Sequence, residues 1–580
     1  MRMNVSRAVV DRLVANGIDT VFGIPGKQTL PLNETIDERD DIRFVMARHE
    51  TAVTHQAWGY AEASGDLAAT VVVPGPGDMN AMNGLKNAYN DCTPLVHFAV
   101  ETSPELRGGD PIHETPPDTY DNVVKSNVLV ERPESTAVVV EEAIATATTP
   151  PYGPVRVGIP KPFLPQDVPV ATPGEYDRTH LDGVSRSDLE AAANALAASE
   201  TSVIFAGGGV RAADASQELE RVARLLDAPV VTSYKGKGVL PEGSEYSAGT
   251  LSASAPPELL ECLASADAAL AVGTDLDAVT TREWQIEFPE TVVHVTLDPA
   301  DLGNGYEPTV GIVADAKETL SKLREFLDGQ ESGSFIDSSG ESTTATRSGL
   351  ERATAVREAL DDRLEELRGS TPPLTSVSVL EAVRDAVPRD AIVTADAGGF
   401  RVWGLNAFDV YSPRTYVNPG SWASMGTALP AGIGAQLSNP TEDIVVLVGD
   451  GGLMMCVHEL HTAVAEDLPI TVVVSRNEDY ALISEEAGRS YDLEDGAYAW
   501  PDAPIDFVSL ANSLGMTARR ARTPAEIRQA VAEAVAANEP TLLEIPTDPQ
   551  EPQAGEWMTK SEPDGGSKSN GESESNTDRQ

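Results

Sequence analysis

The sequence predicts an α/β protein built from three doubly wound parallel-sheet domains, and three observations lead to this prediction. At 580 residues the chain is too long for a single hydrophobic core. Apolar, β-branched runs alternate with helical patterns along most of the chain, which is typical of parallel sheets. Two stretches rich in small and polar residues, 166–188 and 328–349, divide this alternation into three parts.

Residues 1–165 form the expected N-terminal domain. Its expected helices are Val5–Gly17 and one that ends near Ala63. Its expected strands are Thr20–Phe22, Phe44–Met46, Ala69–Val73 and one within Gly153–Lys161. The first three strands lead into Gly23-Ile24-Pro25-Gly26, into Arg48-His49-Glu50 and into Gly75–Asn80.

Residues 189–327 form the expected central domain, and residues 328–349 a flexible linker rich in Ser, Gly and Thr. The expected central strands are Ser202–Ala206, Pro229–Ser233, Ala268–Gly273 and Val292–Asp298. Gly207-Gly208-Gly209 follows the first of these strands but lacks the G-x-G-x-x-G pattern of dinucleotide-binding proteins. A dinucleotide in this domain is therefore only weakly indicated.

Residues 350–548 form the expected C-terminal domain. Thr523-Pro524-Ala525-Glu526 predicts the start of its last helix, with Thr as the cap and Pro in the first turn. Residues 549–580 are polar and rich in Gly, Ser and Glu, which predicts a disordered tail.

Two neighbouring strands of this domain end in polar residues that suit a metal-bound phosphate group. Ile444–Val448 runs into Gly449-Asp450-Gly451-Gly452, and the strand Ile470–Ser475 is followed by Asn477, 27 residues after Asp450 (477 − 450). The carboxyl ends of parallel strands lie at one edge of a sheet, where such sheets bind ligands. Oxygen ligands beside N–H groups at a helix start predict a divalent cation that bridges a pyrophosphate.

The charge is unusual, because 91 acidic residues face 42 basic ones and the net charge is −49. Self-repulsion of this size destabilises a compact chain unless salt screens it, so we interpret it as adaptation to high intracellular salt. It also argues against nucleic acid as a partner. Three scattered cysteines, the absence of a membrane-length apolar run and a start without a signal-peptide pattern favour the cytoplasm.

Several motifs in a fixed order resemble those of thiamine-diphosphate (ThDP) enzymes, and most closely the large subunits of acetolactate synthases. The motifs are Phe22–Gly26, Arg48-His49-Glu50 with Gly59-Tyr60-Ala61, Gly75–Asn80, Ser424-Met425-Gly426, Leu429–Ala435 and Gly449–Gly452 with Asn477. The resemblance spans Ser6–Pro546. It implies the ThDP-enzyme fold, with pyrimidine-binding, central and pyrophosphate-binding domains in that order.

The resemblance also implies the cofactors and the residues that hold them. Mg²⁺ would be bound by the side chains of Asp450 and Asn477 and by the backbone carbonyl of Asp479. Glu50 would be the catalytic residue that shares a proton with the cofactor pyrimidine, which favours an apolar site and a raised pKa. The residues expected to contact the cofactor are Pro25, Glu50, Asn80, Gly398, Ser424, Met425, Gly449, Asp450, Gly451, Gly452 and Asn477. For His49 and His113, a structural role is favoured over substrate contact.

The sequence departs from acetolactate synthases where those enzymes bind substrate and flavin. Gly399-Phe400 replaces a Gln-His pair, and Thr250–Ala255 lacks the His-Gly pair of the flavin-binding stretch. Arg476 stands where those enzymes have the first Asn of a pair, Asp275 and Val279 each replace an Arg, and the Trp of their substrate channel falls near Glu486. Their Phe-Gln-Glu triplet reads Ile112-His113-Glu114. FAD therefore stays an open but disfavoured alternative to a protein without flavin.

Three functions remain open on the sequence alone. The first is acetolactate synthase-like carboligation, in which a 2-oxo acid loses CO₂ and the remaining fragment is joined to a second carbonyl compound. The second is simple decarboxylation that releases an aldehyde, and the third is a non-catalytic cofactor-binding relative. The resemblance further implies a homodimer or homotetramer whose active sites are shared between chains.

Overall fold

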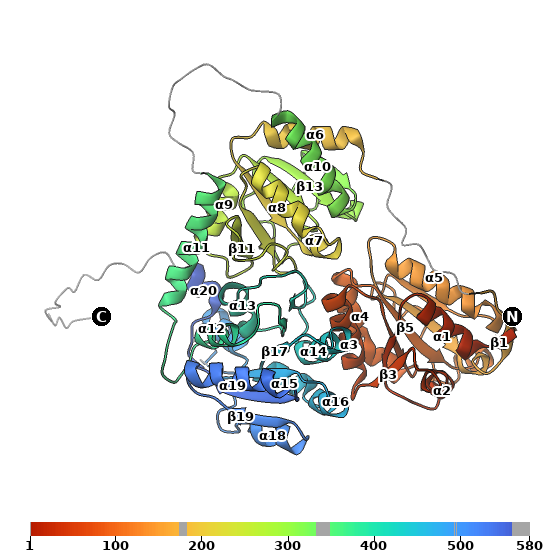
Figure 1. The fold of residues 1–580 in the computed structure, drawn as a ribbon. Helices are drawn as coiled ribbons and strands as arrows, with labels where there is room; N and C mark the ends of the chain where they lie inside the picture. Colours follow the sequence, from red (N-terminus) through yellow and green to blue (C-terminus); the bar gives the residue numbers. More distant parts are fainter. Residues whose placement is uncertain (1, 173–182, 332–347, 492, 495, 560–580) are drawn as a thin grey trace, which may run out of the picture.

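A computed structural model describes residues 2–172, 183–331, 348–491, 493–494 and 496–559. These residues form three six-stranded sheets in which every strand pair is parallel, as the sequence predicts. In Figure 1 the N-terminal and C-terminal domains lie side by side and the central domain lies above them. Four short 3-10 turns also occur, at Pro104–Leu106, Pro133–Ser135, Lys161–Phe163 and Pro299–Asp301.

The N-terminal sheet has the order β3-β2-β4-β5-β7-β6. Its strands are β2 (Thr20–Gly23), β3 (Arg43–Met46), β4 (Ala68–Val72), β5 (Leu95–Glu101), β6 (Ser126–Leu129) and β7 (Val155–Pro160). Its helices are α1 (Val5–Ala15), α2 (Leu30–Asp37), α3 (Glu50–Ser64), α4 (Pro76–Asn90) and α5 (Thr136–Thr148). A separate antiparallel pair joins β1 (Arg2–Asn4) to β8 (Asp167–Pro169).

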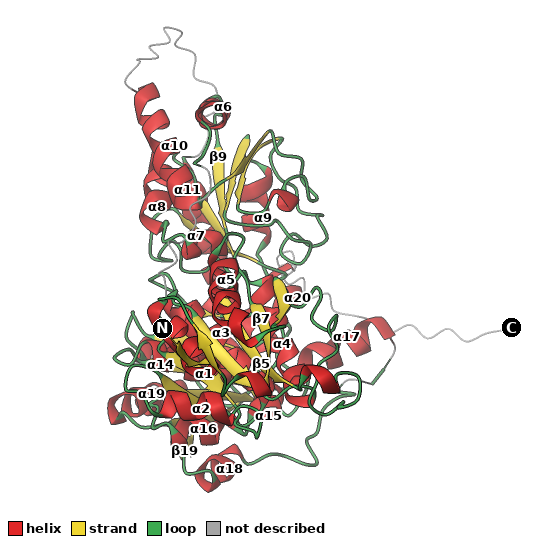
Figure 2. Ribbon diagram, turned by 90° about the vertical axis from the view of Figure 1, so that its right-hand side faces the viewer, coloured by secondary structure: helices red, strands yellow, loops and turns green. Residues whose placement is uncertain are grey.

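The central sheet has the order β11-β10-β9-β12-β13-β14 and lies between helices on both faces (Figure 2). Its strands are β9 (Ser202–Ala206), β10 (Val230–Ser233), β11 (Ser247–Leu251), β12 (Ala268–Val272), β13 (Thr291–Thr296) and β14 (Val310–Val313). Its helices are α6 (Arg186–Ala197), α7 (Gly208–Ala212), α8 (Ser216–Leu225), α9 (Pro257–Ala264), α10 (Ala316–Glu331) and α11 (Gly349–Glu365).

The C-terminal sheet has the order β16-β15-β17-β18-β20-β19. Its strands are β15 (Ile392–Ala395), β16 (Tyr416–Val417), β17 (Ile444–Gly449), β18 (Thr471–Arg476), β19 (Thr517–Arg520) and β20 (Thr541–Pro546). The helices around it are α12 (Ser376–Ala386), α13 (Gly399–Ala407), α14 (Ala428–Ser438), α15 (Asp450–Cys456), α16 (Glu459–Ala465), α17 (Ala481–Tyr491), α18 (Phe507–Ser513), α19 (Pro524–Ala537) and α20 (Ala554–Thr559).

One hydrophobic core is shared between the N-terminal and C-terminal domains. Residues of β2 and β4 and residues of β17 and β18 belong to the same buried cluster, joined through α3, α4, α14 and α16. Helices α3 and α14 approach closely where Gly59 faces the backbone of Ala431 and Gly434 faces the backbone of Gln56. An added Cβ at either glycine would overlap that backbone, so the spacing of the two helices depends on the missing side chains.

The structure differs from the sequence prediction at two boundaries, the start of the tail and the start of the C-terminal domain. Residues 554–559, assigned from composition to a disordered tail, form α20, because Ala554 and Met558 are buried against the C-terminal domain. Helix α11, expected within the C-terminal domain, packs on the central sheet through Ala353 and Val356. Most of the expected linker 328–349 and residues 560–580 of the expected tail lie outside the described residues.

None of the helices in the described part of the chain combines the length and the apolar character that a membrane crossing requires.

Candidate functional site

The two polar strand ends singled out in the sequence lie side by side. Strands β17 and β18 are adjacent and parallel, and their register pairs Gly449 with Ser475. Asp450 follows the end of β17 directly and is the first residue of α15, and Asn477 follows the end of β18. A helix starts at Asp450, so the amides of Gly451 and Gly452 belong to its first turn.

Asp450 is a buried carboxylate that backbone N–H groups surround. Its side chain is 3% exposed, its Oδ2 accepts a hydrogen bond from Glu478 N at 2.7 Å and its Oδ1 accepts one from Gly451 N at 2.8 Å. Burial raises the pKa of Asp450 to about 6. A buried carboxylate at the end of a strand supplies the kind of oxygen ligand that a divalent cation requires.

Asn477 and Asp479 lie on a tight turn that begins where β18 ends. Glu478 between them has a φ of +63°, and Asn477 Oδ1 accepts a hydrogen bond from Asp479 N at 3.2 Å. Arg476, which stands where the family has a first Asn, pairs with Glu478 at 3.0 Å. The described residues contain no group of three or more His, Cys, Asp or Glu side chains that could hold a metal. The expected Mg²⁺ set needs none, because it combines one carboxylate, one amide and one carbonyl.

There is open space at the ends of β15 and β17. A Cβ atom added to Gly398, with its φ of +137°, or to Gly449 would have no heavy atom within 4 Å. Gly449 is the last residue of β17 and Gly398 lies shortly after the end of β15, and these two strands are adjacent. The residues present therefore fit a diphosphate that approaches the backbone and a cation on Asp450.

Asp396 is a further buried carboxylate at this end of the sheet, and it was not identified in the sequence. It is buried at the end of β15 and accepts hydrogen bonds from the backbone N–H groups of Gly426 at 3.0 Å, Thr427 at 2.7 Å and Ala428 at 3.2 Å. It thereby holds the loop of Ser424 and the half-buried Met425 at the start of α14. A carboxylate directly after an apolar strand, as at Asp450, is the signal that could have identified it.

The expected cofactor residues of the N-terminal domain follow three neighbouring strands. Strand β2 pairs with β3 and with β4, so the loop of Pro25, the start of α3 at Glu50 and the start of α4 near Asn80 share one sheet edge. Asn80 Nδ2 donates a hydrogen bond to Glu50 Oε2 at 3.1 Å. Pro25 is exposed.

Glu50 is half-buried at the start of α3. Besides Asn80, its carboxylate lies beside Gly77, where an added Cβ would be 3.1 Å from Oε1. An apolar environment around Glu50 stays a prediction. His49, the residue before it, caps α3 by accepting a hydrogen bond from Thr51 N at 3.2 Å, and His113 contacts Asp110 at 3.0 Å.

The start of α3 also contacts the C-terminal domain of the same chain. The buried carboxylate of Glu459 on α16 accepts hydrogen bonds from Arg48 N at 2.9 Å and from the Gln56 side chain at 2.9 Å. Ser424 accepts one from Asn83 Nδ2 at 2.7 Å. These contacts fix the two proposed cofactor-binding domains relative to each other. Glu459 was not identified in the sequence.

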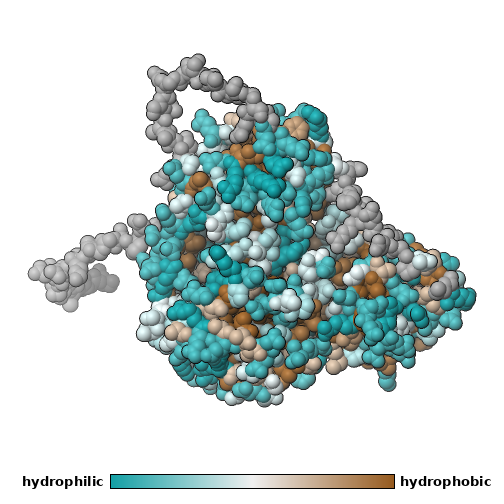
Figure 3. Space-filling model, viewed as in Figure 1, coloured by the Kyte–Doolittle hydropathy of each residue, from teal (hydrophilic) through white to brown (hydrophobic). Residues whose placement is uncertain are grey.

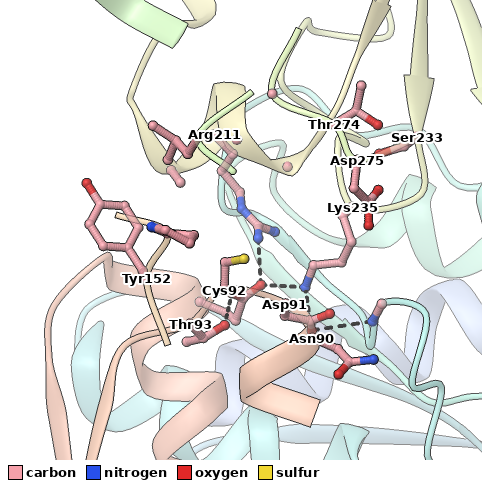
Figure 4. Close-up of a pocket in the computed structure, with 18 of the residues that line it drawn as sticks. Asn90, Asp91, Cys92, Thr93, Tyr152, Arg211, Ser233, Lys235, Thr274 and Asp275 are labelled. Carbon is pink, nitrogen blue, oxygen red and sulfur yellow. Dashed lines mark hydrogen bonds and ion pairs between the residues drawn. The ribbon is translucent and has the colours of Figure 1, made fainter. Parts of the chain in front are cut away.

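A separate pocket of about 270 Å³ lies where all three domains meet (Figure 4). It opens at the carboxyl ends of β9, β10, β12 and β13, where the sequence analysis leaves a dinucleotide as an alternative. In Figure 4, Arg211 and Lys235 extend from the central domain toward Asp91. The carboxylates that line the pocket are those of Glu62, Asp91, Asp275, Asp277, Asp298 and Asp301.

This pocket does not suit the diphosphate of a flavin dinucleotide. Lys235 is already bonded to Glu62 at 2.6 Å and to Asp91 at 2.9 Å, so its charge is neutralised by the protein. Enclosure by the pocket walls, together with nearby Asp277 and Asp301, raises the pKa of Asp275 to about 6. A diphosphate would bring further negative charge to a pocket wall whose carboxylates already disfavour negative charge. That the protein carries no flavin stays a prediction.

The residues that depart from the family lie in several places. Val279 is 59% exposed and Ile112 is 62% exposed. Phe400 is buried on α13, and Glu486 on α17 pairs with Arg489. In the turn that replaces the His-Gly pair, the carbonyl of Ala253 accepts a hydrogen bond from Arg282 at 3.1 Å.

Comparison with known proteins shows matches along nearly the whole chain. Three family models match: the N-terminal TPP binding domain of thiamine pyrophosphate enzymes over residues 3–123, their central domain over 189–323 and their C-terminal TPP binding domain over 396–545. A probable acetolactate synthase large subunit of Methanocaldococcus jannaschii is 29% identical over 560 residues, which cover 95% of this chain and 93% of that protein.

Other relatives extend this similarity. The probable chloroplastic acetolactate synthase 2 of Oryza sativa subsp. japonica is 30% identical over 566 residues, covering 94% of this chain and 83% of that protein. Among solved structures, the thiamine diphosphate-dependent 4-hydroxybenzoylformate decarboxylase of Rhodococcus jostii RHA1 superposes with a TM-score of 0.80 at 25% identity. That match covers 94% of this chain and 99% of the other.

Proposed function

The chain belongs to the thiamine pyrophosphate enzyme family, and on this premise we propose that it binds ThDP with Mg²⁺ and acts on a 2-oxo acid. The proposed reaction is acetolactate synthase-like: CO₂ is lost and the remaining fragment is joined to a second carbonyl compound. The observation that carries this proposal is the buried Asp450 beside Asn477, at strand ends with open space at Gly398 and Gly449.

In the proposed site, Asp450, Asn477 and the carbonyl of Asp479 hold Mg²⁺ and thereby the diphosphate. When bound, ThDP would supply a carbon nucleophile and an electron sink for the decarboxylation of a 2-oxo acid. Glu50 would hold a proton at the pyrimidine ring nitrogen of the cofactor. Met425 supports the cofactor from the C-terminal domain. Gly398, Ser424, Gly449, Gly451 and Gly452 contact it there, and Pro25 and Asn80 from the N-terminal domain.

We further propose that two chains share each active site. Glu50 is only half-buried in a single chain, and a second chain would complete its surroundings. Large apolar side chains are exposed close to the proposed residues: Met79 is 51% exposed, Trp422 44% and Met455 50%. Contact with a second chain would remove this apolar surface from water. Light scattering at working salt is expected to give a dimer or a tetramer, and a fully active monomer would contradict this.

Simple decarboxylation is the second candidate. The solved structure with a TM-score of 0.80 is named as a decarboxylase. Val279 replaces an Arg that holds the carboxylate of the second substrate in the resembled synthases, and the Trp of their substrate channel falls near Glu486. Without contacts for a second carbonyl compound, the fragment would be protonated and leave as an aldehyde.

A panel of 2-oxo acids, supplied with ThDP, Mg²⁺ and molar KCl, tests the proposal. Release of CO₂ with a coupled hydroxy-ketone product would support the carboligase, and release of CO₂ with an equal amount of aldehyde would support the decarboxylase. If the purified protein binds ThDP but releases no CO₂ from any acid in the panel, the chain is a non-catalytic relative.

A further inference from the structure

A buried polar cluster lies directly beneath the first turn of α4. Its centre is Asp78, the third residue of that helix, whose side chain is fully buried. The carboxylate accepts hydrogen bonds from Arg156 Nε at 2.9 Å and from Thr115 Oγ1 at 2.5 Å, and its Oδ1 lies 2.9 Å from His97 Nε2. Tyr120 donates a further hydrogen bond to the same carboxylate at 2.7 Å.

The cluster ties together elements from across the N-terminal sheet. His97 on β5 contacts Thr70 on β4, where His97 Nδ1 and Thr70 Oγ1 are 2.6 Å apart. Arg156 on β7 pairs with both Asp78 and Glu101. Burial opposes ionisation of Asp78, but Arg156 and His97 outweigh burial and hold its pKa well below the usual range. Asp78 is therefore a fixed negative charge that several groups hold in one position.

The opposite side of the same helical turn contacts Glu50. Asn80, two residues after Asp78, donates to Glu50 Oε2, and its carbonyl accepts a hydrogen bond from Thr51 Oγ1 at 2.8 Å. The N–H of Gly75, at the cap of α4, donates to Thr115 Oγ1 at 3.1 Å, and that hydroxyl donates to Asp78. One turn of backbone thus connects the buried cluster to the carboxylate of Glu50.

Burying two carboxylates, a guanidinium and an imidazole costs free energy, and apolar side chains of the same volume could fill such a space. What the charged groups add is a single defined position for the backbone that they bind. We propose that Asp78 and His97 are positioning residues, which set the direction of the Glu50 carboxylate through the first turn of α4 and Asn80. This inference rests on the catalytic role proposed for Glu50.

The experiment is a double-mutant cycle of Asp78→Asn and Asn80→Ala in the full-length protein. Misplacement of a catalytic group by about 1 Å costs up to roughly 10²-fold in rate, so Asp78→Asn should lower kcat roughly ten- to hundredfold with little change in KM. If Asp78 acts through Asn80, the same change in the Asn80→Ala background should lower kcat less than about threefold. If the fold-changes in kcat of the two single variants multiply in the double variant, the inference is overturned.

A second measurement does not depend on activity. Amide hydrogen exchange of the cofactor-free protein should speed up in the first turn of α4 in Asp78→Asn and in His97→Gln, because that turn loses its anchor. Unchanged exchange there in both variants would overturn the inference. If the wild type fails to exchange the C2 proton of ThDP while the α4 response is present, the proposed function is wrong and the anchoring is not.

A matched control is Arg12→Gln. Arg12 is 1% exposed in the same domain and donates to the carbonyls of Ala137 at 3.2 Å and Ala171 at 3.0 Å, away from α4. It should lower stability without moving kcat or the exchange of α4. If Asp78→Asn fails to fold, Thr115→Val replaces it in the cycle. That variant removes one donor to Asp78 and keeps the ionic pairs, and full multiplication with Asn80→Ala would overturn the inference equally.

Discussion

At the scale of single residues, the proposed mechanism depends most on Glu50. Replacing it with Gln keeps the shape and removes the ability to transfer a proton, and general acid–base groups contribute roughly 10²–10⁴-fold. We therefore expect Glu50→Gln to lower kcat in that range and to keep much of the ThDP affinity. Exchange of the C2 proton of bound ThDP for deuterium, followed by NMR, should slow in parallel.

The control for Glu50→Gln is Glu114→Gln. Glu114 is a half-buried carboxylate of the same domain that accepts a hydrogen bond from Gly108 N at 2.8 Å. Its replacement should leave C2 exchange within about twofold of the wild type. Wild-type exchange in Glu50→Gln would mean that another group activates the cofactor.

Asp450 carries the second prediction at this scale. Without its carboxylate, Mg²⁺ loses a ligand and the diphosphate loses its bridge to the protein, so Asp450→Ala should abolish ThDP binding measured by calorimetry. Removal of Mg²⁺ from the wild type with a chelator should have the same effect. Asp443→Ala is the control, because Asp443 directly precedes β17 and so lies at the end of that strand opposite to Asp450. Unchanged affinity in Asp450→Ala would refute the metal assignment.

At the scale of elements, the contact between α3 and α14 depends on glycine. An alanine at position 59 would overlap the backbone of Ala431, so the helices would have to move apart. Overpacking of this kind typically costs about 1–3 kcal/mol, and more where backbone atoms are the obstacle. Gly59→Ala should lower the melting temperature and, by displacing α3, also kcat.

Gly243→Ala is the control for the helix contact. An added Cβ there would meet only the Arg389 side chain at 3.9 Å and the Tyr411 side chain at 4.0 Å, which is ordinary contact. Its melting temperature should stay close to that of the wild type. A Gly59→Ala protein as stable as Gly243→Ala would show that the two helices do not require close contact.

The sequence allows most of the sheet architecture to be predicted, since buried parallel strands are continuous apolar runs such as Ile444–Val448. It also indicates Asp450 and Asn477, because strand ends of one sheet meet at one edge. Asp396 also follows an apolar strand directly, so the same reasoning extends to it. Glu459 could not be assigned in this way, since its partners are backbone N–H groups of a segment distant in sequence. Helix α20 was not predicted for a related reason: its burial depends on a surface that forms only when the C-terminal domain folds.

At the scale of the whole molecule, Glu62 joins the three domains. Its carboxylate on α3 bonds Arg211 at 2.7 Å and Lys235 at 2.6 Å in the central domain, and Lys235 also donates to the carbonyl of Asn418 in the C-terminal domain at 3.1 Å. Breaking a buried ion pair on one side costs about 3–5 kcal/mol. Glu62→Gln should therefore lower the unfolding midpoint, whereas Glu220→Gln, which breaks an exposed pair with Arg224, should change it little.

This junction also predicts a pH dependence. Burial opposes ionisation of Glu62, but Arg211 and Lys235 outweigh burial and hold its pKa well below the usual range. A carboxyl group whose folded pKa is lowered stabilises the protein above its unfolded pKa of about 4.3, and this contribution is lost as the pH falls through the folded value. The wild type should thus lose stability on acidification below about pH 4.5 more steeply than Glu62→Gln. Equal slopes in thermal melts would contradict the assignment.

The net charge of −49 leads to the last prediction, which concerns salt. Figure 3 shows a face dominated by hydrophilic residues, and the chain has 91 acidic residues against 42 basic ones. The screening length falls from about 10 Å at 0.1 M salt to about 3 Å at 1 M, so molar KCl should remove most of the repulsion between neighbouring acids.

We expect the melting temperature to rise steeply between low and molar KCl. As the salt is lowered, the proposed dimer should dissociate before the single chain unfolds, because repulsion between two chains of equal charge opposes association. The salt effect should be smaller at pH 5 than at pH 8, since protonation of part of the carboxylates reduces the same charge; this comparison separates screening from a general effect of concentrated salt on water. A melting temperature that does not change with KCl at pH 8 would show that the acidic surface is not an adaptation to salt.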